Sequence, residues 1–173
     1  MKYVPGDVLY GRTNVFGGYS QKGAVQSNVV TMSSNVDKQY PTKYYLYGGY
    51  GAGSGKVTAN TVNVKSDFSG TIYGGYSSGN GAVTNNRVNL YHSVNAKGSV
   101  SGNTLGVQAL YNKPLTAKTI SNMKNLNFYL PQNIKNGLTV LKADVVVPKE
   151  GTTVNMYANG GVNLRTGNSV YLL

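Results

Sequence analysis

Residues 72–90, with the sequence IYGGYSSGNGAVTNNRVNL, contain both halves of a motif that recurs along the chain. The first half is an apolar residue, an aromatic residue, two glycines and a tyrosine. The second half has the pattern Gly-x-Val-x-x-Asn-x-(Val/Leu)-x-(Val/Leu/Met), in which Val88 and Leu90 alternate with polar residues. This period of two is typical of a β-strand, and the intervening Gly, Asn, Ser and Thr residues disfavour a helix. The motif therefore predicts short strands joined by turns.

The two halves recur at spacings that indicate a repetitive fold. The first half is also present at Val15–Tyr19 and Leu46–Tyr50, and the second half has its asparagine at positions 28, 60, 86 and 103. These asparagines are 32, 26 and 17 residues apart, so the connecting segments vary in length while the strand pattern stays the same. Variable loops between constant strands are typical of a solenoid, in which each circuit of the chain, or rung, stacks on the one before it.

Stacked parallel rungs place equivalent residues about 4.8 Å apart, so each position of the motif predicts a column of like side chains. The asparagines are expected to form a hydrogen-bonded ladder of amides at one corner, and the apolar residues two positions later are expected to fill the interior. The predicted ladder consists of Asn28, Asn60, Asn86 and Asn103, and the interior column of Val30, Val62, Val88 and Leu105. The Gly-Gly pairs are expected where the backbone turns or where a neighbouring segment leaves no room for a Cβ atom.

The tyrosine that ends the first half of the motif predicts a third column, formed by Tyr19, Tyr50 and Tyr76. In one interpretation these half-buried rings stack on one another and only stabilise the fold. In the other they form an aromatic strip that contacts a ligand. The sequence leaves both interpretations open.

The repeats fade after about residue 110, where short strand-like segments separated by turn residues follow. Asn125–Pro131 alternates as a strand does and ends in proline, and Gly137–Val147 is also strand-like. These segments predict β-hairpins that cover the open end of the solenoid, whose backbone edge would otherwise pair with other chains. We therefore expect one domain, with repeat-built rungs over residues 1–110 and the final rungs and a hairpin-rich C-terminal cap over residues 111–173.

Composition and charge restrict the function. The 173 residues include 16 Lys and Arg against five Asp and Glu, and the resulting net charge of +11 favours anionic partners such as polysaccharides or nucleic acids. The chain has no Cys, which excludes disulfides and thiolate metal sites. It also has no apolar run near the roughly 20 residues of a membrane-spanning helix.

Catalysis is not expected from the few acid–base residues. Glycoside hydrolysis, the usual chemistry of polysaccharide-degrading enzymes with parallel β-helices, needs two carboxylates that flank the scissile bond. Asp37 lies in an insertion at residues 37–43, Asp67 lies in a turn, and neither belongs to the stacked strand motifs. His92 has no partner in a recognisable motif. We expect no catalytic residue, no cofactor and no metal site.

The repeats resemble those of bacterial autotransporter passenger regions, which are secreted by the type V pathway. The resemblance lies in Ile72–Ser77 and Val83–Leu90, in the NFYLP sequence within Leu126–Gly137, and in Leu164–Val170, which is similar to a Leu-x-x-Gly-Asp-x-Val strand near the passenger end. It implies a right-handed parallel β-helix that is exported to the cell surface or secreted, often as an adhesin. It also implies a C-terminal β-barrel translocator in the full-length chain. Because Met1–Gly6 has no apolar region typical of a signal peptide, we expect a segment of the passenger.

The resemblance predicts a non-catalytic adhesin or structural stalk whose partner, if it has one, is a host or matrix protein or glycan. The candidate contact residues are Tyr19, Tyr50, Tyr76, Asp37, Lys38 and Lys43. One alternative is a basic, tyrosine-rich module that binds an anionic polysaccharide or nucleic acid, although no signature of a nucleic-acid-binding fold accompanies the charge. A polysaccharide-degrading β-helix enzyme is the third hypothesis.

Overall fold

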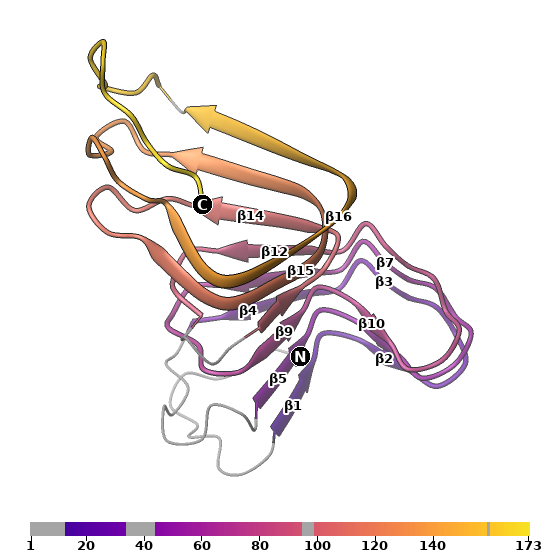
Figure 1. The fold of residues 1–173 in the computed structure, drawn as a ribbon. Coiled ribbons are helices and arrows are strands. Elements are labelled where there is room, and N and C mark those ends of the chain that lie inside the picture. The colour runs from indigo at the N-terminus through magenta and orange to yellow at the C-terminus, as the bar shows by residue number, and fades with distance from the viewer. Residues whose placement is uncertain (1–12, 34–43, 95–98, 159) are drawn as a thin grey trace.

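A computed structural model describes residues 13–33, 44–94, 99–158 and 160–173 of the protein (Figure 1). Within these ranges the fold is all-β: sixteen strands are present and no helix. None of these residues therefore belongs to a helix that could cross a lipid bilayer.

The strands are grouped into six rungs of the chain. Each of the first three rungs has four short strands: β1 (Thr13–Phe16), β2 (Tyr19–Ser20), β3 (Val25–Gln26) and β4 (Val29–Met32); β5 (Tyr44–Tyr47), β6 (Tyr50–Gly51), β7 (Val57–Thr58) and β8 (Thr61–Val64); β9 (Thr71–Tyr73), β10 (Tyr76–Ser77), β11 (Val83–Thr84) and β12 (Arg87–Leu90). The later rungs are simpler and consist of β13 (Ser99–Ser101) with β14 (Thr104–Gln108), then β15 (Leu115–Leu130), then β16 (Leu141–Ala158).

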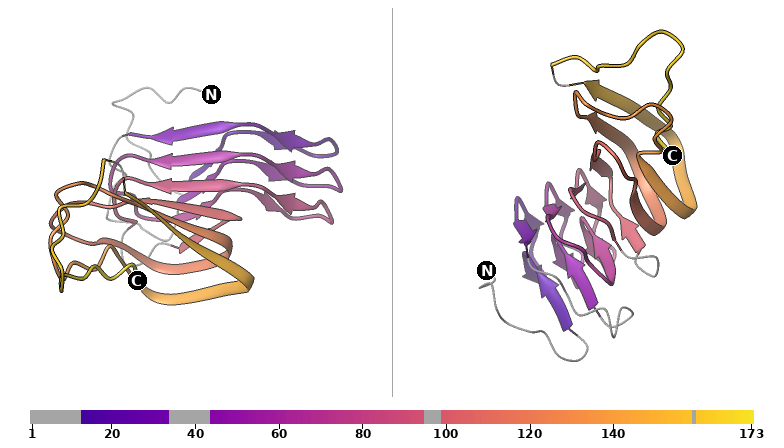
Figure 2. Two further views of the ribbon diagram at one scale, coloured as in Figure 1. Left: turned by 90° about the horizontal axis from the view of Figure 1, so that it is seen from above. Right: turned by 90° about the vertical axis from the view of Figure 1, so that its left-hand side faces the viewer.

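One large parallel sheet forms the wall of the molecule. Its strand order is β1-β5-β9-β13-β15-β14-β12-β8-β4, with β16 on the outer side of β15. The long strand β15 pairs first with β13 and then with β14, so the sheet folds back on itself and is nearly closed into a barrel-like solenoid (Figures 1 and 2). These findings confirm the prediction of an all-β solenoid built from parallel strands.

An arm projects from this wall in the first three rungs (Figure 1). It consists of residues 17–28, 48–60 and 74–86, whose short strands stack into two three-stranded parallel sheets, β2-β6-β10 and β3-β7-β11. The chain leaves the wall at each Gly-Gly pair and returns to it at the ladder asparagine. In the fourth rung, Gly102 and Asn103 alone connect β13 to β14. The shortest spacing between ladder asparagines is therefore explained by the loss of the arm from that rung.

The core lies inside the wall, where the inward-facing residues of successive strands stack in register. Val62, Val88 and Leu105 are fully buried, as the alternation predicts, and Val30 in the first rung is partly buried. The largest buried side chains include Phe128, Leu46, Ile72, Leu90, Leu115 and Leu141. The folded sheet has two limbs, one formed by β1, β5, β9 and β13 and the other by β4, β8, β12 and β14. The large buried residues come from both limbs, so burial of their apolar surface holds the limbs together.

Final rungs are present within residues 111–173, as expected, but β15 and β16 form these rungs and not the hairpins that were expected with them. β15 and β16 are long strands that pair in parallel from Leu115–Leu141 to Leu130–Ala158. Residues 160–173 contact the preceding loop, as in the hydrogen bond from Val140 N to Tyr171 O at 2.8 Å. Alternation and turn residues fit a hairpin and a further rung equally well, and the long-range pairing of β15 with both limbs of the sheet favours the rung.

Candidate functional site

The predicted tyrosine column is present on the arm, in strands β2, β6 and β10. The ring centroids of Tyr19 and Tyr50 are 5.6 Å apart, and those of Tyr50 and Tyr76 are 5.4 Å apart. Tyr19 is 53% exposed, while the other two rings are half-buried. The structure therefore brings the three tyrosines together on an accessible surface.

A second aromatic column runs beside the first, at the ends of wall strands β1, β5 and β9. Phe16, Tyr47 and Tyr73 stack with centroid distances of 5.0 and 5.2 Å and interplanar angles of 13° and 7°. Edge contacts join the two columns, as between Tyr47 and Tyr50, whose centroids are 5.2 Å apart at 89°. We call these six residues, Phe16, Tyr47, Tyr73, Tyr19, Tyr50 and Tyr76, the aromatic ledge. Sequence reasoning missed the second column, although its signal is the aromatic residue before each Gly-Gly pair.

The asparagine ladder lies at the corner where the arm returns to the wall. The Nδ2 atom of Asn28 donates to Asn60 Oδ1 at 2.8 Å, that of Asn60 to Asn86 Oδ1 at 2.9 Å, and that of Asn86 to Asn103 Oδ1 at 3.3 Å. Each Oδ1 atom also accepts the backbone N–H of the preceding asparagine, at 3.0–3.1 Å. The structure thus places all four predicted asparagines in one hydrogen-bonded series.

The Gly-Gly pairs connect the ledge to the ladder. A Cβ atom on the second glycine of each pair would overlap the side-chain amide of a ladder asparagine, as at Gly49 against Asn60 and at Gly75 against Asn86. These positions therefore have glycine because the ladder packs directly against the backbone. The tight approach fixes the turn from wall to arm, and with it the relative position of the two aromatic columns.

The two tyrosines of the wall column, Tyr47 and Tyr73, are held in the uncharged form at physiological pH. Burial, together with the neighbouring phenols of Tyr73, Tyr50, Tyr45 and Tyr76, raises the pKa of Tyr47 to about 12. Burial and the phenol of Tyr76 also raise the pKa of Tyr73. The phenol groups of Tyr47 and Tyr73 therefore keep their protons and can donate and accept hydrogen bonds.

The remaining candidate contact residues, Asp37, Lys38 and Lys43, lie outside the described residues. Asp67 Oδ1 lies 3.7 Å from His92 Nδ1, in a pair whose side chains are both 51% exposed. In the part of the chain that the structure describes, no three His, Cys, Asp or Glu side chains lie close enough to hold a metal ion together.

The geometry of the site is therefore that of an aromatic surface repeated over three rungs. Compared with known proteins, the chain matches no family model, no curated protein and no solved structure.

Proposed function

We propose that this chain is a non-catalytic binding segment of an autotransporter passenger, displayed at a bacterial cell surface or secreted. The aromatic ledge carries the proposal, because it groups six aromatic residues in two columns and leaves Tyr19 exposed and Tyr50 and Tyr76 half-buried at the surface. The resemblance of the repeats supports the passenger assignment, and a C-terminal β-barrel translocator would belong to the full-length chain. A right-handed parallel β-helix is the fold we propose for it, since crossovers between parallel strands of one sheet are right-handed in about 98% of cases.

The ledge suits a ligand that is flat, extended and rich in hydroxyl groups. Its rings stack on one another along each column, and the tyrosines of the arm column, Tyr19, Tyr50 and Tyr76, are the ones at the surface with Tyr19 most exposed. Aromatic residues of this kind combine a large apolar area with a polar tip, which is why they are frequent at binding surfaces. A glycan of the host or of the extracellular matrix has both the apolar faces and the hydroxyl groups that this surface would contact.

The experiment is a binding screen of the intact protein on an array of neutral and acidic host glycans and matrix proteins. We expect binding that falls at least fivefold in Tyr19→Ala, because Tyr19 is the most exposed ring of the ledge. The matched control is Tyr111→Ala, which removes a tyrosine that is 49% exposed but lies outside the ledge. Equal binding by Tyr19→Ala and the wild-type protein would contradict the proposal.

The anionic-polymer hypothesis rests on a different observation, the net charge of +11. It predicts binding of single-stranded DNA that weakens steeply with salt. A gel shift at two salt concentrations separates the two functions, because ligand contact by the aromatic ledge should depend little on ionic strength.

A further inference from the structure

A cavity lies at the point where both columns of the aromatic ledge end. In the wall, Tyr73 pairs in register with Ser101 of the fourth rung, so a small side chain takes the place where the column would continue. On the arm, β10 is the last strand of its sheet, and no ring follows Tyr76. One face of each of these two tyrosines is therefore left without a stacked aromatic neighbour in the described structure.

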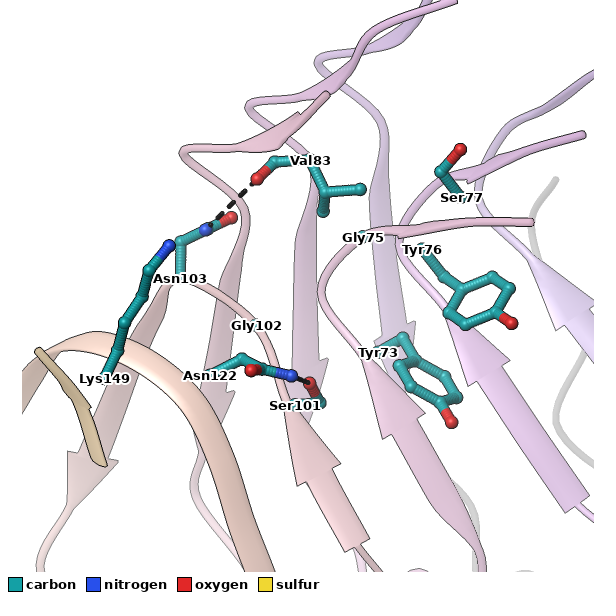
Figure 3. A pocket seen from close by; sticks show the side chains of 10 residues that line it. All are labelled: Tyr73, Gly75, Tyr76, Ser77, Val83, Ser101, Gly102, Asn103, Asn122 and Lys149. Atoms are coloured by element: carbon teal, nitrogen blue, oxygen red, sulfur yellow. Dashed lines mark hydrogen bonds between the residues drawn. The ribbon is translucent and has the colours of Figure 1, made fainter. Parts of the chain in front are cut away.

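Both tyrosines line a cavity of about 270 Å³, and Figure 3 shows them on the opposite side of the lining from Lys149. Third-rung residues form one side, and residues of rungs four to six form the other. Its lining consists of Tyr73, Gly75, Tyr76, Ser77, Val83, Ser101, Gly102, Asn103, Asn122 and Lys149. The volume is at the small end of ligand pockets in proteins, which favours a single ring over a long segment of ligand.

The cavity offers several polar groups that can contact a hydroxylated ring. The Nδ2 atom of Asn122 donates to Ser101 Oγ at 3.2 Å, which holds both side chains at the wall of the cavity. Strand β10 has a strand partner on one side only, so the backbone at Ser77 also presents polar groups toward the cavity. Two aromatic rings with hydroxyl, amide and backbone groups around them are the combination that a sugar ring needs.

Lys149 supplies the only charge among the described residues of this lining, and the local backbone holds it there. Residue Met123 pairs with Pro148, but Asn125 pairs with Thr153, so residues 149–152 form a bulge in β16. Thr152 Oγ1 donates to Met123 O at 2.9 Å across the bulge, which ties it to β15. Figure 3 shows the side chain of Lys149 extending from this bulge toward Asn103. Among the described residues, no acidic side chain lines the cavity to neutralise the ammonium group.

We propose that this cavity binds a single sugar residue that carries a carboxylate, stacked on Tyr73 and Tyr76 and paired through its carboxylate with Lys149. The inference rests on the proposed function, which it makes specific to acidic glycans. The carboxylate can come from a uronic acid or from a sialic acid, and both present the same charge beside a hydroxylated ring. An ion pair between an ammonium and a carboxylate is a charge-assisted hydrogen bond, stronger than the neutral contacts around it.

The test is calorimetric titration of the intact protein with two acidic probes, a hyaluronan tetrasaccharide and 3′-sialyllactose. Each probe is compared with its carboxyl-reduced form, which keeps the rings and removes the charge. We expect the wild-type protein to bind at least one acidic probe about tenfold more tightly than its reduced form. Lys149→Gln should bring that ratio close to one, and Tyr76→Ala should weaken binding of the acidic and the reduced form alike.

Lys142→Gln is the matched control, because Lys142 is an exposed lysine on the same strand that does not line the cavity. It should keep the wild-type ratio. An equal loss in Lys142→Gln and Lys149→Gln would overturn the inference in favour of general charge attraction. A wild-type ratio of one, or no binding of either acidic probe, would overturn it as well.

These results are independent of the test of the ledge. If array ligands depend on Tyr19 but no acidic probe depends on Lys149, the inference about the cavity fails and the proposed function stands. If an acidic probe depends on Lys149 while no array ligand depends on Tyr19, the ledge is not the binding surface and the cavity is.

Discussion

Asn60 and Asn86 are fully buried, and their side-chain amides bind backbone groups at the corner where the arm of the preceding rung returns to the wall. Asn60 Oδ1 accepts from Asn28 N at 3.1 Å, while its Nδ2 atom donates to Val25 O at 3.1 Å and to Asn86 Oδ1 at 2.9 Å. A buried polar group without a hydrogen-bond partner lowers the stability of the fold. Each of these asparagines stabilises the fold because it supplies partners to the backbone groups at the corner of the preceding rung.

The first prediction concerns this corner. Asn60→Ala should lower the free energy of unfolding by about 2–4 kcal/mol, because it leaves buried backbone groups of the first rung without hydrogen-bond partners. The control, Asn63→Ala, removes an amide from the outer face, where Asn63 donates to Thr31 Oγ1 at 3.3 Å and accepts from Asn89. We expect the control to cost less than about 1 kcal/mol. Urea denaturation measures both, and equal losses would contradict the role of the ladder.

The residue before each of the first three ladder asparagines has a left-handed backbone conformation. The φ angles are 57° at Ser27, 55° at Ala59 and 55° at Asn85. Non-glycine residues seldom adopt this region, and Ser and Ala give no local sign of it. This corner is therefore imposed by the ladder, which pulls the following asparagine inward, and it could not be predicted from the residues that form it.

At the scale of secondary-structure elements, two sets of strands hold the aromatic ledge. The wall column lies at the ends of β1, β5 and β9, and the arm column lies in β2, β6 and β10. Tyr47 lies at its centre and is only 8% exposed, with Phe16 and Tyr73 on its two faces. Ionisation of this phenol would place a charge among apolar rings. The pKa of Tyr47 is raised to about 12 for that reason.

The second prediction follows from this pKa. A free tyrosine has a pKa near 10, so as the pH rises from about 10 to 12 the unfolded chain loses the Tyr47 proton before the folded protein does. The stabilisation is complete below about pH 10 and is lost as the pH passes through the folded value. Urea unfolding at pH 8 and pH 11 should show a loss of stability about 1 kcal/mol larger in the wild-type protein than in Tyr47→Phe.

The phenylalanine variant serves as its own control for other groups that titrate in this range, because it changes Tyr47 alone. Tyr73, whose pKa is also raised, contributes in the same direction to both proteins. An identical loss of stability in the two proteins between pH 8 and pH 11 would show that Tyr47 is not held in its neutral form by the ledge.

The whole molecule is a stack in which each rung contacts mainly its neighbours. β12 matches β8 residue for residue, with Arg87 beside Thr61 and Leu90 beside Val64. Stability in such a stack is approximately a sum over units and their interfaces. Removal of one complete repeat should therefore leave a folded protein whose wall and arm each have one rung fewer.

The third prediction tests this arrangement by deletion of residues 61–86, which joins Asn60 to Arg87 and keeps the register of ladder and core. The variant should unfold cooperatively, with a urea m-value about 15% smaller, because 26 of 173 residues are gone. Deletion of residues 61–73 is the control. It removes two wall strands but no arm segment, and it should abolish cooperative unfolding measured by circular dichroism.

In the last strand of the stack, the local sequence pattern does not determine the pairing or the burial of the residues. In β16, Val154 and Met156 pair with the buried residues Leu126 and Phe128, yet they are 52% and 61% exposed because the described structure has no rung beyond them. Their alternation is that of a core strand. Whether such a strand forms a hairpin or a further parallel rung depends on which edge it meets, and this is a property of the assembled sheet.

The sequence by itself determined the strands, the stacking of like residues, the asparagine ladder and the first tyrosine column, because each follows from one motif repeated at equivalent positions. Only the tertiary structure decided that the Gly-Gly pairs open into a projecting arm and that the fourth rung omits it. It also places Lys149 in the lining of the same cavity as Tyr76, which is 73 residues earlier in the chain. The sequence period predicts which residues stack in one column. It does not predict the cavity, because the cavity forms where the column ends and residues of later rungs meet it in the folded chain.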